Sequence, residues 1–313
     1  MKKDSRIYVA GHNGMVGSSI VRKLKREGYS NLILKSSYEL DLRDQKMVEA
    51  FFENERPEFV FLAAAKVGGI FANDSHPEAF LYDNLMIEMN VINNSVKFGV
   101  KKLLFLGSSC IYPKFATQPI REECLLSGPL EHTNEAYALA KISGLKYCQY
   151  LSEKLGKAYF ALMPTNLYGP NDNYHPLNSH VLPALILKFH EAKMLKQPCV
   201  KVWGSGKPLR EFLHVDDLAS ACLLAMQKLN NFQLMNVGSG EEISIKDLSL
   251  LIKEIVGYEG EIIFDESKPD GTPRKLVDST KIKELGWLPE IRLVSGIQET
   301  YQNFLTTDKR VER

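Results

Sequence analysis

The chain lacks two features that would assign it to a special class, a charge of one sign and a long apolar run. Of its 313 residues, 39 are Lys or Arg and 38 are Asp or Glu, which gives a net charge of +1. So small a charge produces no broad field to attract nucleic acid or an anionic membrane surface. No apolar stretch is long enough to cross a bilayer. We therefore expect neither nucleic acid nor a membrane as partner, and an anionic ligand has to be held by local geometry.

Cysteine is also scarce, and its spacing argues against a disulfide framework. The five cysteines are odd in number and contain no C-x-x-C pair, which favours reduced thiols. The first six residues contain neither the apolar stretch nor the small-residue cleavage site of a signal peptide. We therefore expect a cytoplasmic protein. Its cysteines are Cys110, Cys124, Cys148, Cys199 and Cys222.

What the sequence does contain is an alternation of short apolar runs with amphipathic stretches. The runs at 7–10, 32–34, 59–64, 103–106 and 159–162 lack polar alternation, as expected of strands that are buried on both faces. The amphipathic stretches between them predict helices, and the βαβα order predicts a parallel sheet. The fold class is therefore α/β, a Rossmann-type doubly wound parallel sheet with a smaller C-terminal α/β region.

The boundary between the two regions is expected after Pro164, where the pattern loosens into a segment rich in Asn, Pro, Gly and His. The helix that follows Asp216 and Asp217, and the short strand at 234–237, could return to the main sheet. We therefore assign residues 1–165 plus about 212–238 to the Rossmann domain. Residues from about 166 to 211, plus 239–313, form the smaller domain.

Three glycines follow the first predicted strand and open a predicted helix. Gly11, Gly14 and Gly17 form G-x-x-G-x-x-G, the spacing of the short-chain dehydrogenase/reductase variant of the dinucleotide loop. A tight strand-to-helix turn needs glycine, and a pyrophosphate at a helix N-terminus leaves no room for side chains. The alternative is a packing turn without a ligand. The order of strand, loop and helix favours cofactor binding.

The residues after the second predicted strand bear on the choice of cofactor. An NAD enzyme usually offers a carboxylate to the adenosine ribose there. This chain has Lys35, Ser36 and Ser37, with the nearest acid at Glu39. A cation and two hydroxyls suit a 2′-phosphate, which favours NADPH over NADH, and a solvated loop is the alternative. Asp41–Leu42 could contact the adenine.

A tyrosine and a lysine four residues apart predict a catalytic pair. Tyr137 and Lys141 fall on one face of a predicted helix. A free tyrosine has a pKa of about 10, so it needs a nearby positive charge to exchange protons near neutral pH. Ser108 ends the buried run at 103–107, at the carboxyl edge of the sheet where ligands bind. Its hydroxyl could share a carbonyl oxygen with Tyr137. A surface tyrosine and lysine are the alternative for Y-x-x-x-K alone.

Two further residues predict proton chemistry in the same place. Cys110 lies two positions after Ser108, so it faces the same side if the strand continues, and its thiolate could act as a base. His180 ends the irregular segment and could donate a proton. The alternatives are a small buried cysteine and a surface histidine. His175 is near His180, but no cysteine or carboxylate cluster accompanies them, so we expect no metal.

Beyond these motifs, the chain carries longer blocks that are spread over nearly its whole length. They are Ala63–Ile70, Leu106–Lys114, Met163–Pro170, Asn178–Val181, Trp203–Gly206, Arg210–Asp217 and Lys268–Lys275. Through these blocks the chain resembles the GDP-L-fucose synthase family of extended short-chain dehydrogenase/reductases.

The resemblance implies a homodimeric epimerase-reductase that converts GDP-4-keto-6-deoxy-D-mannose to GDP-L-fucose with NADPH. It implies that Cys110 is the base that inverts C3 and C5 of the sugar and that His180 delivers a proton to the opposite face. Ser108, Tyr137 and Lys141 correspond to the reductase triad. In this family the dimer forms through helices of the cofactor domain, for which the predicted helices at 77–98 and 137–155 are candidates.

The resemblance also implies a cofactor site and a sugar-nucleotide site. Lys188, Trp203, Arg210 and Asp270 correspond to residues that contact the GDP-sugar. The expected NADP(H) contacts, from the motifs and the resemblance together, are Gly11, His12, Asn13, Gly14, Met15, Val16, Gly17, Lys35, Ser36, Asp41, Leu42, Ala63, Ala64, Leu106, Gly107, Ser108, Tyr137, Lys141, Pro164, Thr165, Asn166, Leu167 and His180.

The chain departs from the family pattern at two places, and three other functions stay open. Some members carry arginines that hold the 2′-phosphate where this chain has Asn13 and Ser37, which predicts a weaker hold on NADPH or tolerance of NADH. One alternative is a 4-reductase, with or without epimerase activity, for a related GDP-4-keto-6-deoxy sugar such as a heptose. The others are a nucleotide-sugar 4-epimerase and a non-catalytic cofactor sensor.

Overall fold

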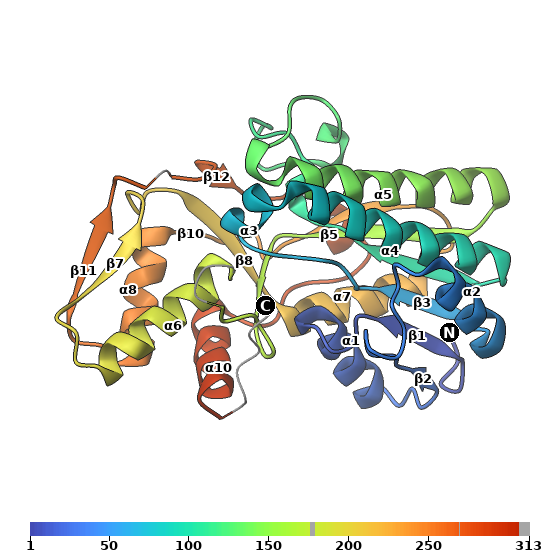
Figure 1. Cartoon of the computed structure of the whole chain (residues 1–313), viewed down its shortest axis with the longest axis horizontal. Coiled ribbons are helices and arrows are strands. Elements are labelled where there is room, and N and C mark those ends of the chain that lie inside the picture. Colours follow the sequence, from blue (N-terminus) through green and yellow to red (C-terminus); the bar gives the residue numbers. More distant parts are fainter. Residues whose placement is uncertain (176–178, 269, 307–313) are drawn as a thin grey trace.

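The computed structural model describes residues 1–175, 179–268 and 270–306 as two lobes around a shared centre (Figure 1). Asn178 and Pro269, which belong to two of the blocks above, lie outside the described residues, as do residues 307–313. Within the described part, no helix combines the length and apolarity needed to cross a membrane.

The larger lobe is built on a six-stranded sheet in the order β2-β1-β3-β4-β5-β9, and every neighbouring pair is parallel. This confirms the predicted Rossmann-type class, including the return of the strand at 234–237 to the main sheet. The strands are β1 (Ile7–Ala10), β2 (Leu32–Ile33), β3 (Phe59–Leu62), β4 (Lys102–Leu106), β5 (Ala158–Pro164) and β9 (Leu234–Val237).

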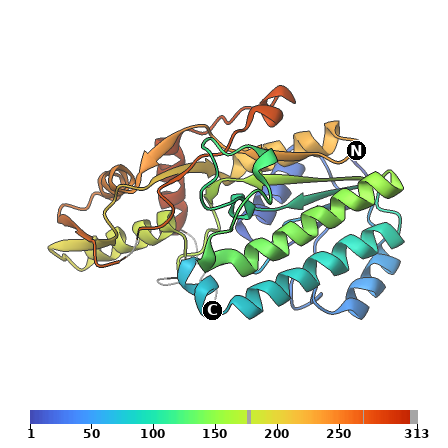
Figure 2. The same cartoon turned by 90° about the horizontal axis from the view of Figure 1, so that it is seen from above.

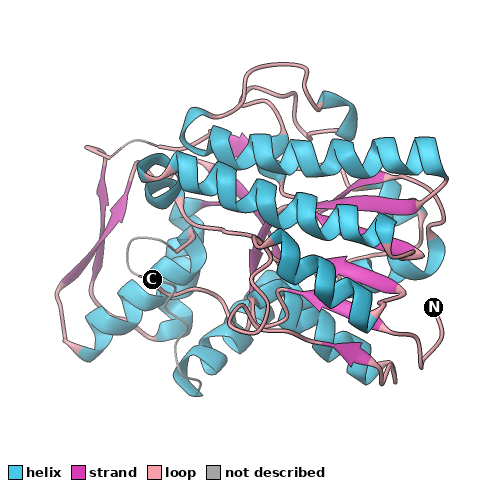
Figure 3. Cartoon of the chain, turned by 45° about the vertical axis from the view of Figure 1, so that its right-hand side comes forward, coloured by secondary structure: helices cyan, strands magenta, loops and turns pink. Residues whose placement is uncertain are grey.

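Helices cover both faces of this sheet, as the all-buried strands require (Figure 3). One face packs against α1 (Met15–Arg26) and α7 (Val215–Lys228), and the other packs against α2 (Gln45–Glu55), α4 (Pro77–Lys97) and α5 (Glu135–Leu155). Figure 2 shows α4 and α5 side by side along the second face.

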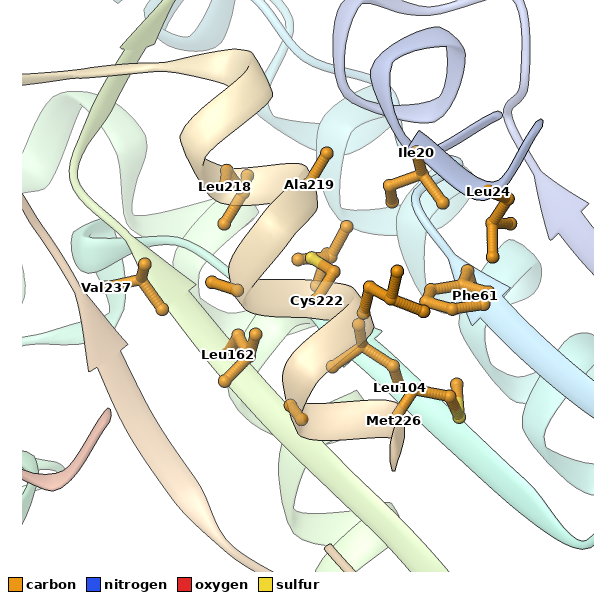
Figure 4. Packing of buried hydrophobic residues seen from close by; sticks show 14 of the residues in the cluster. Ile20, Leu24, Phe61, Leu104, Leu162, Leu218, Ala219, Cys222, Met226 and Val237 are labelled. Atoms are coloured by element: carbon orange, nitrogen blue, oxygen red, sulfur yellow. The ribbon is translucent and has the colours of Figure 1, made fainter. Parts of the chain in front are cut away.

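Side chains of the sheet and of α7 form a close-packed layer on the first face. In Figure 4, Leu218 and Cys222 of α7 lie above Leu104 and Leu162 of the sheet. These residues are almost completely buried. Removing one methylene from such a layer lowers the stability of the fold by about 1 kcal/mol. The packing therefore keeps α7 at a fixed distance from the strands.

The smaller lobe has its own core, between three helices and short strands. β8 (Leu209–His214) pairs with β6, β10 and β12, and β7 pairs with β11. A separate cluster of buried and partly buried apolar side chains joins the helices of this lobe and all of its strands except β12. Besides β8, the elements of the lobe are β6 (Asn166–Tyr168), β7 (Cys199–Trp203), β10 (Glu242–Ser244), β11 (Glu261–Asp265), β12 (Arg274–Lys275), α6 (Val181–Met194), α8 (Ile245–Val256) and α10 (Leu293–Thr306).

The order of the strands fixes where a ligand can bind. The chain runs from β1 outward to β2 and then crosses back to β3 on the other side of β1. At such a reversal the loops after the two central strands diverge and leave a crevice at their carboxyl ends. Gly11 follows β1, and Ala63 and Ala64 follow β3, so both loops open onto this crevice.

His214 joins the two lobes, because it ends β8 and caps α7. Its Nδ1 accepts a hydrogen bond from the backbone N–H of Asp216 at 3.3 Å, and its ring meets the ring of Tyr168 edge-on at 5.3 Å. Burial lowers the pKa of His214 below the ordinary value for histidine. The acceptor role requires a neutral imidazole, so protonation would remove the cap.

The cap on α7 should make stability depend on pH. Since the pKa of His214 is lower in the folded state, its contribution is complete above about pH 6.5 and is lost as the pH falls below that value. Asn can cap a helix without titrating, so His214→Asn should lose less stability between pH 7.5 and pH 5.5. In urea unfolding, the change in the free energy of unfolding with pH should differ between the wild type and His214→Asn by up to about 1.4 kcal/mol per pH unit. Parallel loss of stability in both proteins would contradict the assignment.

Candidate active site

The glycine loop forms a cradle that only glycine can line. Gly11 has φ +81°, and a Cβ there would lie 2.7 Å from the backbone nitrogen of Ala64. A Cβ on Gly17 would overlap the carbonyl oxygen of Gly11. α1 begins next to this turn, and no side chain caps its N-terminus. Its first N–H groups are therefore available to an anion, as the sequence predicts.

A cavity of about 760 Å³ opens at this crevice and extends toward the smaller lobe. Every residue predicted from the sequence to be catalytic or to contact the cofactor lines it. From the larger lobe these are Gly11, His12, Asn13, Gly14, Met15, Val16, Gly17, Lys35, Ser36, Asp41, Leu42, Ala63, Ala64, Leu106, Gly107, Ser108, Cys110, Tyr137, Lys141 and Pro164, and beyond it Thr165, Asn166, Leu167 and His180.

At the β2 end of the cavity, several charged side chains are held by hydrogen bonds or paired with a charge of opposite sign. Ser36 donates hydrogen bonds to the carboxylate of Glu39 from its backbone N–H at 2.8 Å and from its hydroxyl at 2.7 Å. These bonds lower the pKa of Glu39. Arg43 also lines the cavity, but it forms ion pairs with Asp41 at 2.8 Å and Asp83 at 3.3 Å. Lys35 lines the same wall and forms no ion pair with any of the described residues.

Ser108 and Cys110, which the sequence predicts to be catalytic, share a short turn after β4. The sequence prediction assumed that the strand continues to Cys110, but β4 ends at Leu106. Instead, residues Ser109–Ile111 form a 3₁₀ turn that Ser108 caps, with its Oγ accepting a hydrogen bond from the Cys110 N–H at 3.2 Å. Both residues nevertheless line the cavity.

Tyr137 and Lys141 lie on α5, as predicted. The Lys141 side chain is 2% exposed, and its Nζ donates a hydrogen bond to the carbonyl oxygen of Leu106 at 3.1 Å. The Nζ lies 5.8 Å from the centre of the Tyr137 ring. Burial raises the pKa of Tyr137, and the charges of Cys110 and Glu88 act in the same direction. Tyr137 is therefore a proton donor in the protein as it stands.

The structure adds a cation that the sequence reasoning missed. Lys275, from β12 of the smaller lobe, donates a hydrogen bond to Sγ of Cys110 at 3.3 Å. It lines the same cavity as His180, whose pKa is lowered by its enclosure in the protein and further by Lys275. An ammonium at this distance would stabilise a negative charge on the sulfur.

The four residues expected to contact the sugar nucleotide lie outside this cavity, in the smaller lobe. Trp203 is 55% exposed, and the Nζ of Lys188 lies 5.1 Å from the centre of its ring. Asp270 accepts two hydrogen bonds from Ser205, at 2.9 Å and 2.6 Å. Burial lowers the pKa of Arg210, and the charge of Asp270 opposes that shift.

Arg210 connects these residues to the cavity. It is paired with Lys275 across the β8–β12 ladder, and its Nη1 donates a hydrogen bond to the carbonyl oxygen of Thr272 at 2.6 Å. One strand pair thus carries an arginine of the smaller lobe and the lysine that contacts Cys110. A ligand long enough to extend from Arg210 to Lys275 could contact both side chains.

Known proteins are similar to this chain in sequence and in fold. The model of the NAD dependent epimerase/dehydratase family matches residues 7–238. The chain is 58% identical over 307 residues to a putative GDP-L-fucose synthase of Arabidopsis thaliana, covering 97% of this chain and 93% of that protein. It is 52% identical to the GDP-L-fucose synthase of Escherichia coli, covering 97% and 98%.

A solved structure has the same fold. A GDP-mannoheptose C4 reductase from Campylobacter jejuni, with NADP bound, is 40% identical, with a TM-score of 0.91 over 98% of this chain and all of that one. Together with the cradle and the Ser108, Tyr137 and Lys141 arrangement, these matches show that the chain belongs to the NAD dependent epimerase/dehydratase family and, within it, to the GDP-L-fucose synthases.

Proposed function

We propose that this enzyme converts GDP-4-keto-6-deoxy-D-mannose to GDP-L-fucose, inverting C3 and C5 of the sugar and reducing C4 with NADPH. One observation carries the proposal: a single cavity holds the groups for both reactions. Ser108, Tyr137 and Lys141 serve reduction, and Cys110 and His180 serve proton transfer. The high identity to GDP-L-fucose synthases supports the choice of sugar.

The residues at the crevice fit a dinucleotide. The cradle formed by Gly11 and Gly17 and the uncapped start of α1 suit a pyrophosphate, and Nδ1 of His12 is buried without a partner among the described residues. Lys35 supplies a cation for a 2′-phosphate, although Asn13 and Ser37 stand where some relatives have arginines. When bound, the reduced cofactor supplies the hydride for C4.

Proton removal depends on charges that the chain itself provides. Ser108 and Tyr137 donate hydrogen bonds to the C4 ketone oxygen, which increases the acidity of the C–H bonds at C3 and C5. Cys110, as the thiolate, takes the C–H proton, and the electron pair moves to the ketone oxygen to give an enolate. Lys275 stabilises the thiolate before this step. His180, in its imidazolium form, then donates a proton to the opposite face of the carbon and becomes neutral.

Reduction uses the same oxygen-binding pair. As C4 is reduced, its oxygen gains negative charge, and Tyr137 transfers its phenolic proton to that oxygen. The ammonium of Lys141 stabilises the resulting phenolate. One pair of donors, Ser108 and Tyr137, therefore acts on the same oxygen in both epimerisations and in the reduction.

In the smaller lobe, we propose that Lys188, Trp203, Arg210 and Asp270 hold the GDP portion. A planar guanidinium binds phosphate oxygens in a bidentate manner, and an exposed indole offers a surface for a nucleobase. The larger lobe then carries the cofactor and the smaller lobe the sugar nucleotide, with the reacting carbon between them.

A second candidate, a 4-reductase for a GDP-4-keto-heptose, is favoured by the similarity to the Campylobacter reductase. Such an enzyme needs Ser108, Tyr137 and Lys141 but no proton transfer at carbon. The contact of Lys275 with Cys110 and the position of His180 in the same cavity favour the epimerase-reductase. Reduction alone would not require a thiol beside an ammonium.

We also propose that the enzyme is a cytoplasmic homodimer that associates through α4 and α5. Both helices carry exposed apolar side chains, namely Tyr82, Leu139 and Tyr150. Leu139 and Tyr150 are eleven residues apart, so they fall on one face of α5. Sedimentation equilibrium should give about twice the chain mass of 35.4 kDa, and Leu139→Arg with Tyr150→Glu should give the chain mass. A wild-type monomer would refute the dimer.

Reaction in heavy water tests the proposed function directly. GDP-4-keto-6-deoxy-D-mannose and NADPH should give GDP-L-fucose that carries deuterium at both C3 and C5, as read by NMR, together with oxidation of one NADPH per product. Reduction without deuterium would instead support the reductase candidate. Absence of turnover would show that the substrate is a different sugar.

Cys110→Ala separates the two reactions in the same assay. It should lower deuterium incorporation by about 100-fold or more, the usual effect of removing a general base, while reduction of a sugar already inverted at C3 and C5 continues. Cys199→Ala, which replaces a half-buried cysteine of β7 outside the cavity, is the matched control and should behave like the wild type. Loss of both reactions in Cys110→Ala would refute this division of roles.

A further inference from the structure

Helix α4 carries a carboxylate that the proposed reaction does not use. The Glu88 side chain is 0% exposed, and both of its oxygens are enclosed. Burying an ionised carboxylate without a partner is costly, so its position needs an explanation. The explanation lies on α5: Oε1 of Glu88 is 3.0 Å from Nζ of Lys141.

The contact holds the ammonium of Lys141 by charge. It is an ion pair without good hydrogen-bond alignment, since neither oxygen of Glu88 has a hydrogen-bond partner among the described residues. The second anchor of Nζ is the Leu106 carbonyl oxygen at 3.1 Å. A lysine ammonium has three N–H donors, and the Leu106 carbonyl oxygen takes one of them, so a donor remains for a group in the cavity.

The helix packing makes room for this carboxylate at one residue. Gly144 lies one helical turn after Lys141, on the same face of α5. A Cβ on Gly144 would lie 2.5 Å from Oε2 of Glu88 and 2.8 Å from the ring of Phe105. Any other residue at 144 would push the carboxylate away from Lys141. The glycine and the carboxylate therefore form one structural unit with the lysine.

We propose that Glu88 is a positioning residue for Lys141. Glu88 holds the Lys141 ammonium at the cavity wall and keeps it charged while Tyr137 gives up its proton. The inference rests on the proposed roles of Tyr137 and Lys141 but not on the identity of the sugar. Without Glu88, a buried ammonium has no counter-charge and gives up its proton more readily.

Two other roles for Glu88 are less consistent with the geometry. A proton store that refills Tyr137 would need a route to water, but both oxygens of Glu88 are enclosed. A packing role alone would be served better by an apolar side chain, because a buried ion pair is often neutral or unfavourable relative to one. The ion pair with Lys141 is the one charged contact that the described residues give this carboxylate.

The protonation of Glu88 provides a readout that packing alone would not produce. Burial raises the pKa of Glu88 to about 7, and Lys141 opposes that rise. The charge of Glu88 by itself raises the pKa of Tyr137 and of Cys148 on α5, so its support for Tyr137 has to act through Lys141, and β4 contributes the apolar ring of Phe105. Above this pKa the pair is complete, and below it the wild type has a neutral carboxyl.

The test compares Glu88→Gln with the wild type at two pH values. At pH 8, kcat for reduction should be about tenfold lower in the variant, because the Lys141 ammonium is no longer held in place beside Tyr137. At pH 6 the two enzymes should converge, because Glu88 is then protonated in the wild type. The same loss at both pH values would overturn the proposal. Glu78→Gln, on the exposed first turn of α4, is the matched control.

A double-variant cycle checks that Glu88 acts through Lys141. In a Lys141→Met background, Glu88→Gln should lower kcat no further, and a further tenfold loss would overturn the proposal. Urea unfolding without cofactor adds a readout that does not depend on turnover. Each single variant should lower the midpoint, and the double variant should unfold no earlier than the worse single variant, since it buries no unpaired charge.

These measurements separate the inference from the proposed function. If the wild type fails to turn over the GDP-sugar, the proposed substrate is wrong, while the urea cycle still tests the ion pair. If Glu88→Gln fails to fold, Lys141→Met and the double variant supply the comparison. Where both single variants fold, additive lowering of the urea midpoint would overturn the proposal, and where Glu88→Gln does not fold, a double variant that unfolds earlier than Lys141→Met would overturn it.

Discussion

The packing of α5 against α4 and the carboxyl edge of β4 determines where the reacting groups lie. Along one face of α5, Tyr137 borders the cavity, Lys141 is held between Glu88 and the end of β4, and Gly144 lets the two helices approach. Ser108 comes directly after the same strand. Small changes in this packing would move the oxygen-binding pair and its charge together, because interiors are close-packed.

The second constraint is electrostatic, since the proposed reaction places negative charge on three different atoms. In that proposal the charge forms in turn on the Cys110 sulfur, on the ketone oxygen and on the Tyr137 oxygen. Lys275 lies beside the sulfur, and Lys141 lies on the tyrosine side, so each cation is matched to one acid. The lysines come from different lobes, which means that the complete site exists only when the lobes are joined.

The sequence predicted the parts of the site that depend on local spacing. The glycine turn, the pair Tyr137 and Lys141 and the βαβα order all follow from periodicities of one helix or one turn. The two ion contacts that complete the site join residues far apart in sequence: 165 positions separate Cys110 from Lys275, and Glu88 comes from another helix than Lys141. No local pattern specifies such contacts. The polar residues at 84 and 88, on the buried face of α4, were the available signal.

The central claim is that Tyr137 acts on the same ketone oxygen in epimerisation and in reduction. Tyr137→Phe, which keeps the ring and removes the hydroxyl, tests it when deuterium exchange at C3 and C5 and hydride transfer are measured in one sample. The account predicts that both rates fall by about 100-fold or more. Exchange at the wild-type rate, with only hydride transfer lost, would contradict it.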